Sequence, residues 1–168
     1  MRNIVLVGFM GTGKTTLARM LSERTGMKYI STDAIIEKKE GMTIKDIFSE
    51  KGEAHFRKAE KCAIKSASEE KNAVIDAGGG AVMDPENVKN LKQNGIMVCL
   101  WAEPEIILKR TGESLARPLL NIPKPGDKIK ELLEIRKPFY ERADYHVNTS
   151  SMSIGEAASL IEKHVKNA

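Results

Sequence analysis

The chain has few residues of several kinds that mark whole classes of protein. Among its 168 residues only Cys62 and Cys99 are cysteines, and their spacing fits neither a disulfide framework nor a zinc site. Aromatic residues make up 5% of the chain, which leaves few surfaces on which nucleic-acid bases stack. The net charge of +4 is modest and no block of five like charges occurs, so no nucleic-acid surface is indicated.

Long apolar stretches are absent as well. Nothing approaches the roughly 20 apolar residues of a membrane span, and the run Ile4–Val7 is too short for the core of a signal peptide. An apolar content of 41% with 30% charged residues instead suits a globular protein. We therefore expect one cytoplasmic domain over residues 1–168, a monomer with neither membrane nor nucleic-acid partners.

Short apolar runs alternate with helical patterns along the chain. This alternation predicts an α/β fold, a five-stranded parallel sheet flanked by helices. The expected strands are Ile4–Val7, Lys28–Ser31, Ala73–Ala77, Ile96–Trp101 and Tyr145–Asn148. Ligands of such sheets bind at the carboxyl ends of the strands, so the residues after each run are the candidates for a site.

The segment after the first run has the pattern of a phosphate-binding loop. From Gly8 it has four further residues and then Gly-Lys-Thr, which predicts a nucleoside triphosphate site. Lys14 would reach the β- and γ-phosphates and the Thr15 hydroxyl would ligate Mg²⁺. The residues assigned to the nucleotide are Gly11, Thr12, Gly13, Lys14, Thr15 and Thr16. The alternative is a Gly-rich turn with an exposed lysine.

Two segments are expected to extend the core formed by 1–32, 71–110 and 126–168. Residues 33–70 are mostly helical and longer than a minimal crossover, which predicts an inserted substrate-binding subdomain; two ordinary covering helices are the alternative. Residues 112–125 are irregular and rich in proline, which predicts a lid carrying Arg117.

Several single residues at these places allow two interpretations. Asp33 follows the second strand and suits a substrate contact or the N-cap of the next helix. Arg57 is either a ligand or a solvated helix cation, and Gly78–Gly80 either a close approach to a ligand or a plain turn. Arg136 closes an apolar helix stripe, so it either snorkels to solvent or pairs with an anion. The following Lys137-Pro138 predicts that the helix breaks there.

The full set of motifs resembles the shikimate kinase family. Behind the phosphate loop come Phe56-Arg57, Gly78-Gly79-Gly80, Arg117-Pro118-Leu119-Leu120 and Arg136-Lys137-Pro138-Phe139-Tyr140, and the resemblance runs from Val5 to about Thr149. It implies a P-loop kinase fold of the nucleoside monophosphate kinase type, with a substrate-binding insertion and a lid. It also implies transfer of the γ-phosphoryl group of ATP to the 3-hydroxyl of shikimate, with Mg²⁺, in aromatic amino-acid biosynthesis.

The same resemblance implies a role for each matching residue. Lys14, Asp33 and Arg117 would be catalytic, with Asp33 orienting and perhaps deprotonating the 3-hydroxyl. Arg110 and Arg117 would contact the nucleotide. The substrate would be held by Asp33, Arg57, Gly78, Gly79, Gly80 and Arg136. The chemistry is sound on its own terms, because arginine binds a carboxylate through two parallel hydrogen bonds and a nearby carboxylate can accept a hydroxyl proton.

The sequence departs from the family at one place. The usual Asp-x-Asp after the second strand is Ser31-Thr32-Asp33 here, so the carboxylate that helps to hold Mg²⁺ is missing. Mg²⁺ keeps several waters and needs few protein ligands. Our hypothesis is that Asp76, at the end of the third strand, holds a Mg²⁺-bound water in its place; the alternative is a solvated strand-end aspartate.

Three other functions are weighed against this one. Gluconate kinases share the architecture and also act on a polyhydroxy acid, but Arg57, the triple glycine and Arg136 favour shikimate. Nucleoside monophosphate kinases of the adenylate kinase type usually have glycine where this chain has Thr15. A non-catalytic nucleotide switch is disfavoured by Asp33 and the lid arginine.

Overall fold

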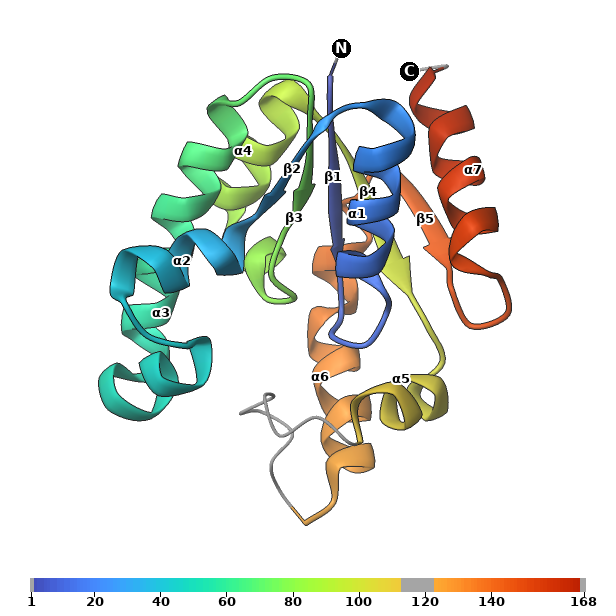
Figure 1. Cartoon of the computed structure of the whole chain (residues 1–168). Coiled ribbons are helices and arrows are strands. Elements are labelled where there is room, and N and C mark those ends of the chain that lie inside the picture. Colours follow the sequence, from blue (N-terminus) through green and yellow to red (C-terminus); the bar gives the residue numbers. More distant parts are fainter. Residues whose placement is uncertain (1, 113–122, 167–168) are drawn as a thin grey trace.

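A five-stranded parallel sheet forms the centre of the molecule (Figure 1). The computed structural model describes residues 2–112 and 123–166, and within these ranges the strand order is β2-β3-β1-β4-β5. The strands are β1 (Asn3–Gly8), β2 (Lys28–Ser31), β3 (Ala73–Asp76), β4 (Gly95–Trp101) and β5 (Tyr145–Asn148). Every paired strand runs parallel to its neighbours, so the α/β fold predicted from the sequence is confirmed.

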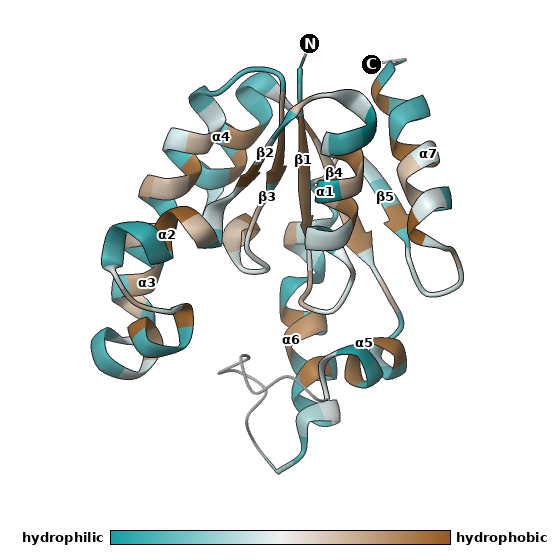
Figure 2. Ribbon diagram, in the orientation of Figure 1, coloured by the Kyte–Doolittle hydropathy of each residue, from teal (hydrophilic) through white to brown (hydrophobic). Residues whose placement is uncertain are grey.

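Helices cover both faces of the sheet. They are α1 (Lys14–Thr25), α2 (Thr32–Glu40), α3 (Ile44–Glu69), the 3₁₀ turn η1 (Ala81–Met83), α4 (Pro85–Asn94), α5 (Pro104–Thr111), α6 (Pro125–Tyr140) and α7 (Ile154–Lys166). Alternate residues of β1 face opposite layers: Ile4 and Leu6 pack with α1 and α7, whereas Val5 and Val7 pack with α3, α4 and α6. This two-sided burial explains why the inner strands β1 and β4 are almost continuously apolar, whereas the edge strands β2 and β5 also carry polar residues (Figure 2).

A third apolar cluster lies between α2 and α3, away from the sheet. Ile36 of α2 packs with Ile47, Phe56 and Ala63 of α3, and the two helices extend beyond the sheet in Figure 1. Within α3, Gly52 has φ 82° and ψ 168°, so the helix is interrupted there by a left-handed, non-helical residue. The predicted helical pattern over 33–70 therefore corresponds to two helices, the second of them kinked.

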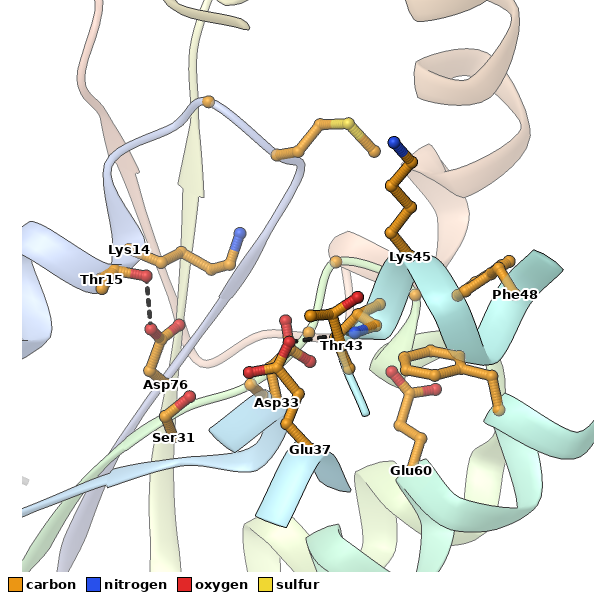
Figure 3. A pocket seen from close by; sticks show the side chains of 18 of the residues that line it. Lys14, Thr15, Ser31, Asp33, Glu37, Thr43, Lys45, Phe48, Glu60 and Asp76 are labelled. Carbon is orange, nitrogen blue, oxygen red and sulfur yellow. Dashed lines mark hydrogen bonds between the residues drawn. The ribbon is translucent and has the colours of Figure 1, made fainter. Parts of the chain in front are cut away.

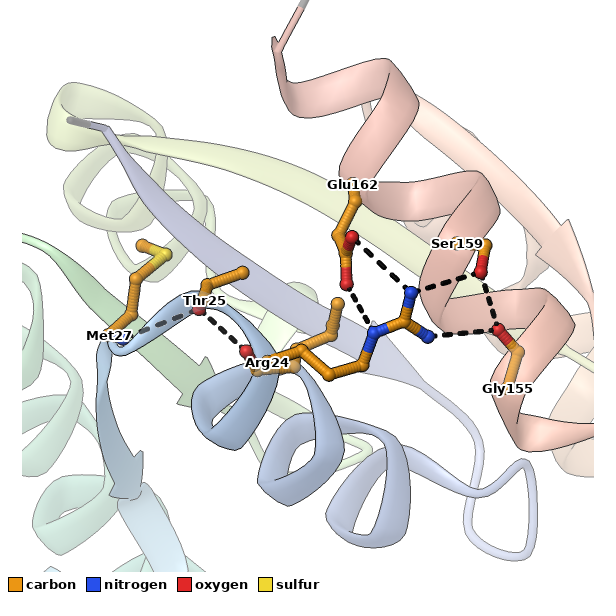
Figure 4. Close-up of polar contacts among 7 residues, drawn as sticks. Arg24, Thr25, Met27, Gly155, Ser159 and Glu162 are labelled. Atoms are coloured by element: carbon orange, nitrogen blue, oxygen red, sulfur yellow. Dashed lines mark hydrogen bonds and ion pairs between the residues drawn. The ribbon is translucent and has the colours of Figure 1, made fainter.

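The helix behind the phosphate loop is braced by the C-terminal helix (Figure 4). Arg24 near the end of α1 forms an ion pair with Glu162 of α7, with Nε 2.8 Å from Oε1. Its guanidinium also donates to the Ser159 hydroxyl at 3.1 Å and to the Gly155 carbonyl at 3.3 Å. These contacts fix the C-terminal end of α1, while its first residues lie at the carboxyl ends of the strands. In the described ranges, no helix has both the length and the apolar character needed to cross a membrane.

Helix α6 differs from its prediction at both ends. It begins at Pro125, inside the segment expected to be irregular, and it continues to Tyr140 although a break was predicted at Lys137-Pro138. Pro138 has no N–H to donate to the carbonyl four residues earlier, but it lies within the last turn, where few such bonds are lost. Burial of Tyr140 and its contact with Gly79 hold this turn in helical form.

Candidate active site

One pocket joins the phosphate loop to the insertion formed by α2 and α3. It encloses about 860 Å³ at the carboxyl ends of the strands, and Figure 3 shows the side chains that converge on it. Of the predicted site residues, those that line it are Gly11, Gly13, Lys14, Thr15, Thr16, Asp33, Arg57, Asp76, Gly78, Gly79, Gly80, Arg110 and Arg136. Thr12 does not line it, and Arg117 lies outside the described residues.

The phosphate loop turns from β1 into α1 through left-handed glycines. Gly11 has φ 77° and Gly13, which caps α1, has φ 94°, so side chains there would strain the backbone. The first N–H groups of α1 therefore face the pocket without intrahelical partners. Thr12 is buried beneath the loop, where its hydroxyl donates to the Phe9 carbonyl at 2.7 Å. Lys14 bends over the loop and donates to the carbonyls of Gly8 and Phe9 at 2.9 and 3.0 Å.

Arg110 ties α5 to the outer side of this loop. Its guanidinium donates to the Gly11 carbonyl at 3.2 Å and to the Thr149 carbonyl at 2.8 Å. The Thr149 hydroxyl in turn donates to the Thr12 carbonyl at 2.9 Å. The ends of α5 and β5 thus meet at the phosphate loop, and Arg110 lines the pocket beside it.

Two arginines from distant helices meet at the triple glycine after β3. Arg57 of α3 lies so close to Gly80 that a Cβ there would be 2.6 Å from its Nη2 atom. Arg136 of α6 is only 3% exposed, and its Nη1 lies 3.5 Å from the position of a Cβ on Gly79. The Nε of Arg136 is buried without a hydrogen-bond partner among the described residues. An arginine whose head is buried in the pocket is not snorkelling to solvent, so that alternative is wrong; the pairing of Arg136 with an anion stays a prediction.

Asp33 lies in the first turn of α2 and not at its cap. Ser31 is the N-cap, and its hydroxyl accepts a hydrogen bond from the Ala34 N–H at 3.2 Å. The capping role offered as the alternative for Asp33 is therefore wrong, because β2 ends two residues earlier. The Asp33 carboxylate lines the pocket, with Oδ1 3.3 Å from the position of a Cβ on Gly78.

Sequence reasoning missed Glu60, one helical turn after Arg57. Its side chain is 1% exposed, and Oε2 accepts from Arg57 Nη1 at 2.8 Å. The other oxygen, Oε1, has no partner among the described residues and lies 2.8 Å from the position of a Cβ on Gly78. Burial raises the pKa of Glu60, despite the opposing attraction of Arg57. The signal was an acid at i+3 from an arginine, on the helix face that also carries Phe56 and Ala63.

Two neighbouring carboxylates, those of Glu60 and Glu53, stabilise the charged form of Arg57. Burial works against the guanidinium charge, but attraction and hydrogen bonds from Glu60 and Glu53 outweigh it and raise the pKa of Arg57. The Glu53 carboxylate, on the more exposed side, lies 3.1 Å from Nη2. Arg57 is therefore held as a cation with a fixed orientation, the state needed to bind a carboxylate.

Tyr140 was quoted only as part of a motif, and the structure gives it a contact. Its hydroxyl donates to the Gly79 carbonyl at 2.6 Å, four residues after Arg136 on the same face of α6. Burial raises its pKa to about 12, so the hydroxyl keeps its proton. Helix α6 thus approaches Gly79 with two side chains: Tyr140 forms a hydrogen bond to its carbonyl and Arg136 lies beside it.

The strand-end aspartate Asp76 lies beside the proposed metal ligand. Thr15 Oγ1 donates to Asp76 Oδ2 at 2.6 Å, and Ser31 is the register partner of Asp76 on β2. Along the described residues, no group of three or more His, Cys, Asp or Glu side chains forms a metal cage. That is compatible with Mg²⁺, which arrives with a nucleotide and needs few protein ligands.

The fold and the pocket define a P-loop kinase for small molecules, with a second, arginine-lined centre across the pocket from the phosphate loop. The family model for shikimate kinase matches residues 10–166. The chain is 46% identical over 163 residues to a shikimate kinase from Thermoanaerobacter pseudethanolicus, covering 97% of this chain and 95% of the relative. The chain therefore belongs to the shikimate kinase family.

Solved structures agree with this assignment. The shikimate kinase from Acinetobacter baumannii in complex with shikimate has a TM-score of 0.95 and 38% identity, over 99% of this chain and 94% of that one. A gluconokinase from Sinorhizobium meliloti has a TM-score of 0.61 and 17% identity, over 99% and 94% of the two chains. At that identity the likeness extends to the fold alone, so the gluconate alternative gains no support from it.

Proposed function

We propose that the protein transfers the γ-phosphoryl group of ATP to the 3-hydroxyl of shikimate, forming ADP and shikimate 3-phosphate. One observation carries the proposal: a single pocket holds Lys14 at one end, and Arg57 with Arg136 against the triple glycine at the other. A phosphate loop alone suits any nucleotide-binding protein. A second, arginine-lined centre facing it suits a small acceptor that carries a carboxylate.

The acceptor side explains the recognition of a hydroxylated acid. Arg57 and Arg136 hold the carboxylate, and the backbone of Gly79 and Gly80 lets the ring approach closely because no side chain intervenes. Asp33 binds ring hydroxyls, orients the attacking 3-hydroxyl and accepts its proton. The open oxygen of Glu60 accepts a further hydroxyl hydrogen bond, which also satisfies a buried carboxylate.

The nucleotide side neutralises and aligns the phosphates. Lys14 exchanges its loop carbonyls for the β- and γ-phosphate oxygens, and the N–H groups at the start of α1 bind the same phosphates. Thr15 would ligate Mg²⁺, which would offset part of the negative charge of the phosphates. Arg110 lies against the base. We assign Arg117, within the lid over 112–125, to the transferring phosphoryl group.

We also propose how the chain divides this work. Residues 33–70 form the shikimate-binding subdomain, supported by their own apolar cluster away from the sheet, and 1–32, 71–110 and 126–168 form the nucleotide-binding core of one domain. The enzyme acts as a monomer in the cytoplasm. Both cysteines are free, which suits a compartment that keeps thiols reduced. Light scattering of the purified protein tests the monomer.

The function is tested by following ADP release with MgATP and each of shikimate, gluconate and AMP. Of the three acceptors, we expect only shikimate to support ADP release. In the nuclear magnetic resonance spectrum of the product, the phosphorus signal should couple to the proton at carbon 3 of the ring. Lys14→Met serves as the inactive control. ADP release with gluconate or AMP but not with shikimate would overturn the proposal. The absence of ADP release with all three acceptors would overturn it as well.

A further inference from the structure

The hydrogen of the Thr15 hydroxyl is used in a hydrogen bond to Asp76 in this structure. Oγ1 donates to Asp76 Oδ2 at 2.6 Å, a short hydrogen bond of the charge-assisted kind. A hydroxyl has one hydrogen to donate and two lone pairs to offer. With its hydrogen directed at Asp76, the lone pairs of Thr15 are directed elsewhere, as a ligand of Mg²⁺ requires. Hydroxyl and carboxylate oxygens are also the donors that this hard cation prefers.

The two carboxylate oxygens of Asp76 have different surroundings. Oδ2 takes the Thr15 hydroxyl and, more weakly, the Tyr29 hydroxyl at 3.4 Å. Oδ1 accepts no hydrogen bond from the described residues, although the side chain lines the pocket and the residue is only 7% exposed. Tyr29 is itself positioned by Arg19 of α1, whose guanidinium carbon lies 5.3 Å from the ring centroid. One oxygen is thus fixed by the protein and the other is open to a ligand.

The register of the sheet explains why the acid stands on β3. Ser31 ends β2 directly beside Asp76, and the same Asp76 is paired with Leu6 of β1. The Ser31 hydroxyl is engaged as the cap of α2, where it accepts from Ala34. Adjacent strands of a parallel sheet lie roughly 4.8 Å apart, so a carboxylate at either position ends close to the same point.

We infer that Asp76 is a positioning residue for the Mg²⁺ that accompanies ATP, and that it acts through two oxygens with separate tasks. Oδ2 orients the lone pairs of Thr15 toward the ion, and Oδ1 accepts a hydrogen bond from a water bound to it. Tyr29 holds the carboxylate in place, and Ser31 is the position on β2 from which an acid would do the same work. The inference rests on the proposed function in that MgATP is the bound nucleotide.

The test measures metal binding without turnover. Free Mn²⁺ is followed by electron paramagnetic resonance as enzyme is titrated into Mn²⁺ and ADP. Loss of such an outer partner typically weakens metal binding by about 10- to 100-fold, and we expect this for Asp76→Ala and Asp76→Asn. Affinity for ADP without metal and for shikimate should stay unchanged. Tyr29→Phe should reduce the affinity for Mn²⁺ by a smaller factor. Tyr145→Phe, at a tyrosine outside the pocket, should leave the affinity for Mn²⁺ unchanged.

The decisive variant moves the acid between strands. Ser31→Asp combined with Asp76→Ala should recover most of the metal affinity lost in Asp76→Ala alone. Unchanged Mn²⁺ binding in Asp76→Ala and Asp76→Asn, or a double variant as weak as the single one, would overturn the inference. Because these measurements need no shikimate turnover, their failure is distinct from a failure of the proposed reaction.

Discussion

At the scale of single residues, the shape of a guanidinium matters more than its charge. Arg136 is buried against Gly79, and its Nε has no hydrogen-bond partner in 2–112 or 123–166, which suits a planar fork that would bind a carboxylate. Arg136→Lys keeps the charge and loses the two parallel bonds. Hydrogen bonds to charged groups contribute about 1.5–3 kcal/mol, so we expect the shikimate KM to rise roughly 10- to 100-fold while the ATP KM stays.

Steady-state kinetics with each substrate varied in turn measures this split. Arg142→Lys is the matched control, because Arg142 lies outside the pocket and its guanidinium stacks on Phe139. Equal increases in the two KM values would show that Arg136 does not hold the acceptor.

Glu60 is proposed to contact the substrate, and its burial is expected to cost stability as pH rises. Its pKa is raised in the folded protein above the ordinary 4.5, chiefly by burial. The folded state therefore binds this proton more tightly than the unfolded chain, so the stabilising contribution is complete below the unfolded pKa and is lost as pH rises through the folded pKa. Arg57 keeps Glu53 as a partner and is partly exposed, so Glu60→Gln does not strand a buried cation.

We therefore expect Glu60→Gln to gain stability relative to wild type as pH rises from 5 to 8, while its shikimate KM increases. Urea unfolding at both pH values, paired with kinetics, measures the two effects. A variant that loses more stability at pH 8 than at pH 5 would contradict this sign.

At the scale of elements, α6 holds the turn after β3 in place. Arg136 and Tyr140 occupy one face of the helix, and the Tyr140 hydroxyl fixes the Gly79 carbonyl at 2.6 Å. Tyr140→Phe leaves that carbonyl without its donor, which costs about 1–3 kcal/mol if it stays buried. The turn then moves, and shikimate loses backbone contacts and Arg136 together.

The expected result for Tyr140→Phe is a higher shikimate KM and a lower melting temperature, with an unchanged ATP KM. Tyr145→Phe is the control for the loss of a tyrosine hydroxyl, because Tyr145 packs edge-on against His164 outside the pocket. A loss of melting temperature without any rise in shikimate KM would reduce Tyr140 to a packing residue.

The elements also show what sequence could and could not predict. The phosphate loop and the strands follow local rules, namely glycine spacing and short runs rich in apolar residues, so they were predicted closely. Glu60 and Tyr140 were not, because each acts across elements, on glycines that are distant in the chain. The end of β2 at Ser31 was predicted, but the start of α2 at the next residue was not, so Ser31 rather than Asp33 is the cap.

At the scale of the whole molecule, the parts proposed to bind the two substrates are built on different cores. The phosphate loop and α1 rest on the sheet, whereas α2 and the first half of α3 rest on the cluster around Ile36, Ile47 and Phe56. Local opening free energies follow the packing of each part, so the α2–α3 region can exchange amide hydrogens without unfolding of the sheet. A ligand that spans both parts must raise the opening free energy of the less stable one.

Hydrogen exchange followed by mass spectrometry is expected to resolve this. Shikimate at about 100 times its Kd adds roughly 2.7 kcal/mol to any opening that releases it, slowing exchange about 100-fold. We expect this protection in 32–60 and 77–80, and protection by MgADP in 8–16. In Arg136→Lys, tested at the same shikimate concentration, protection by shikimate should decrease, whereas protection of 8–16 by MgADP should remain. Shikimate protection confined to 8–16, or spread evenly over α7 and β4, would contradict a separate acceptor site on α2 and α3.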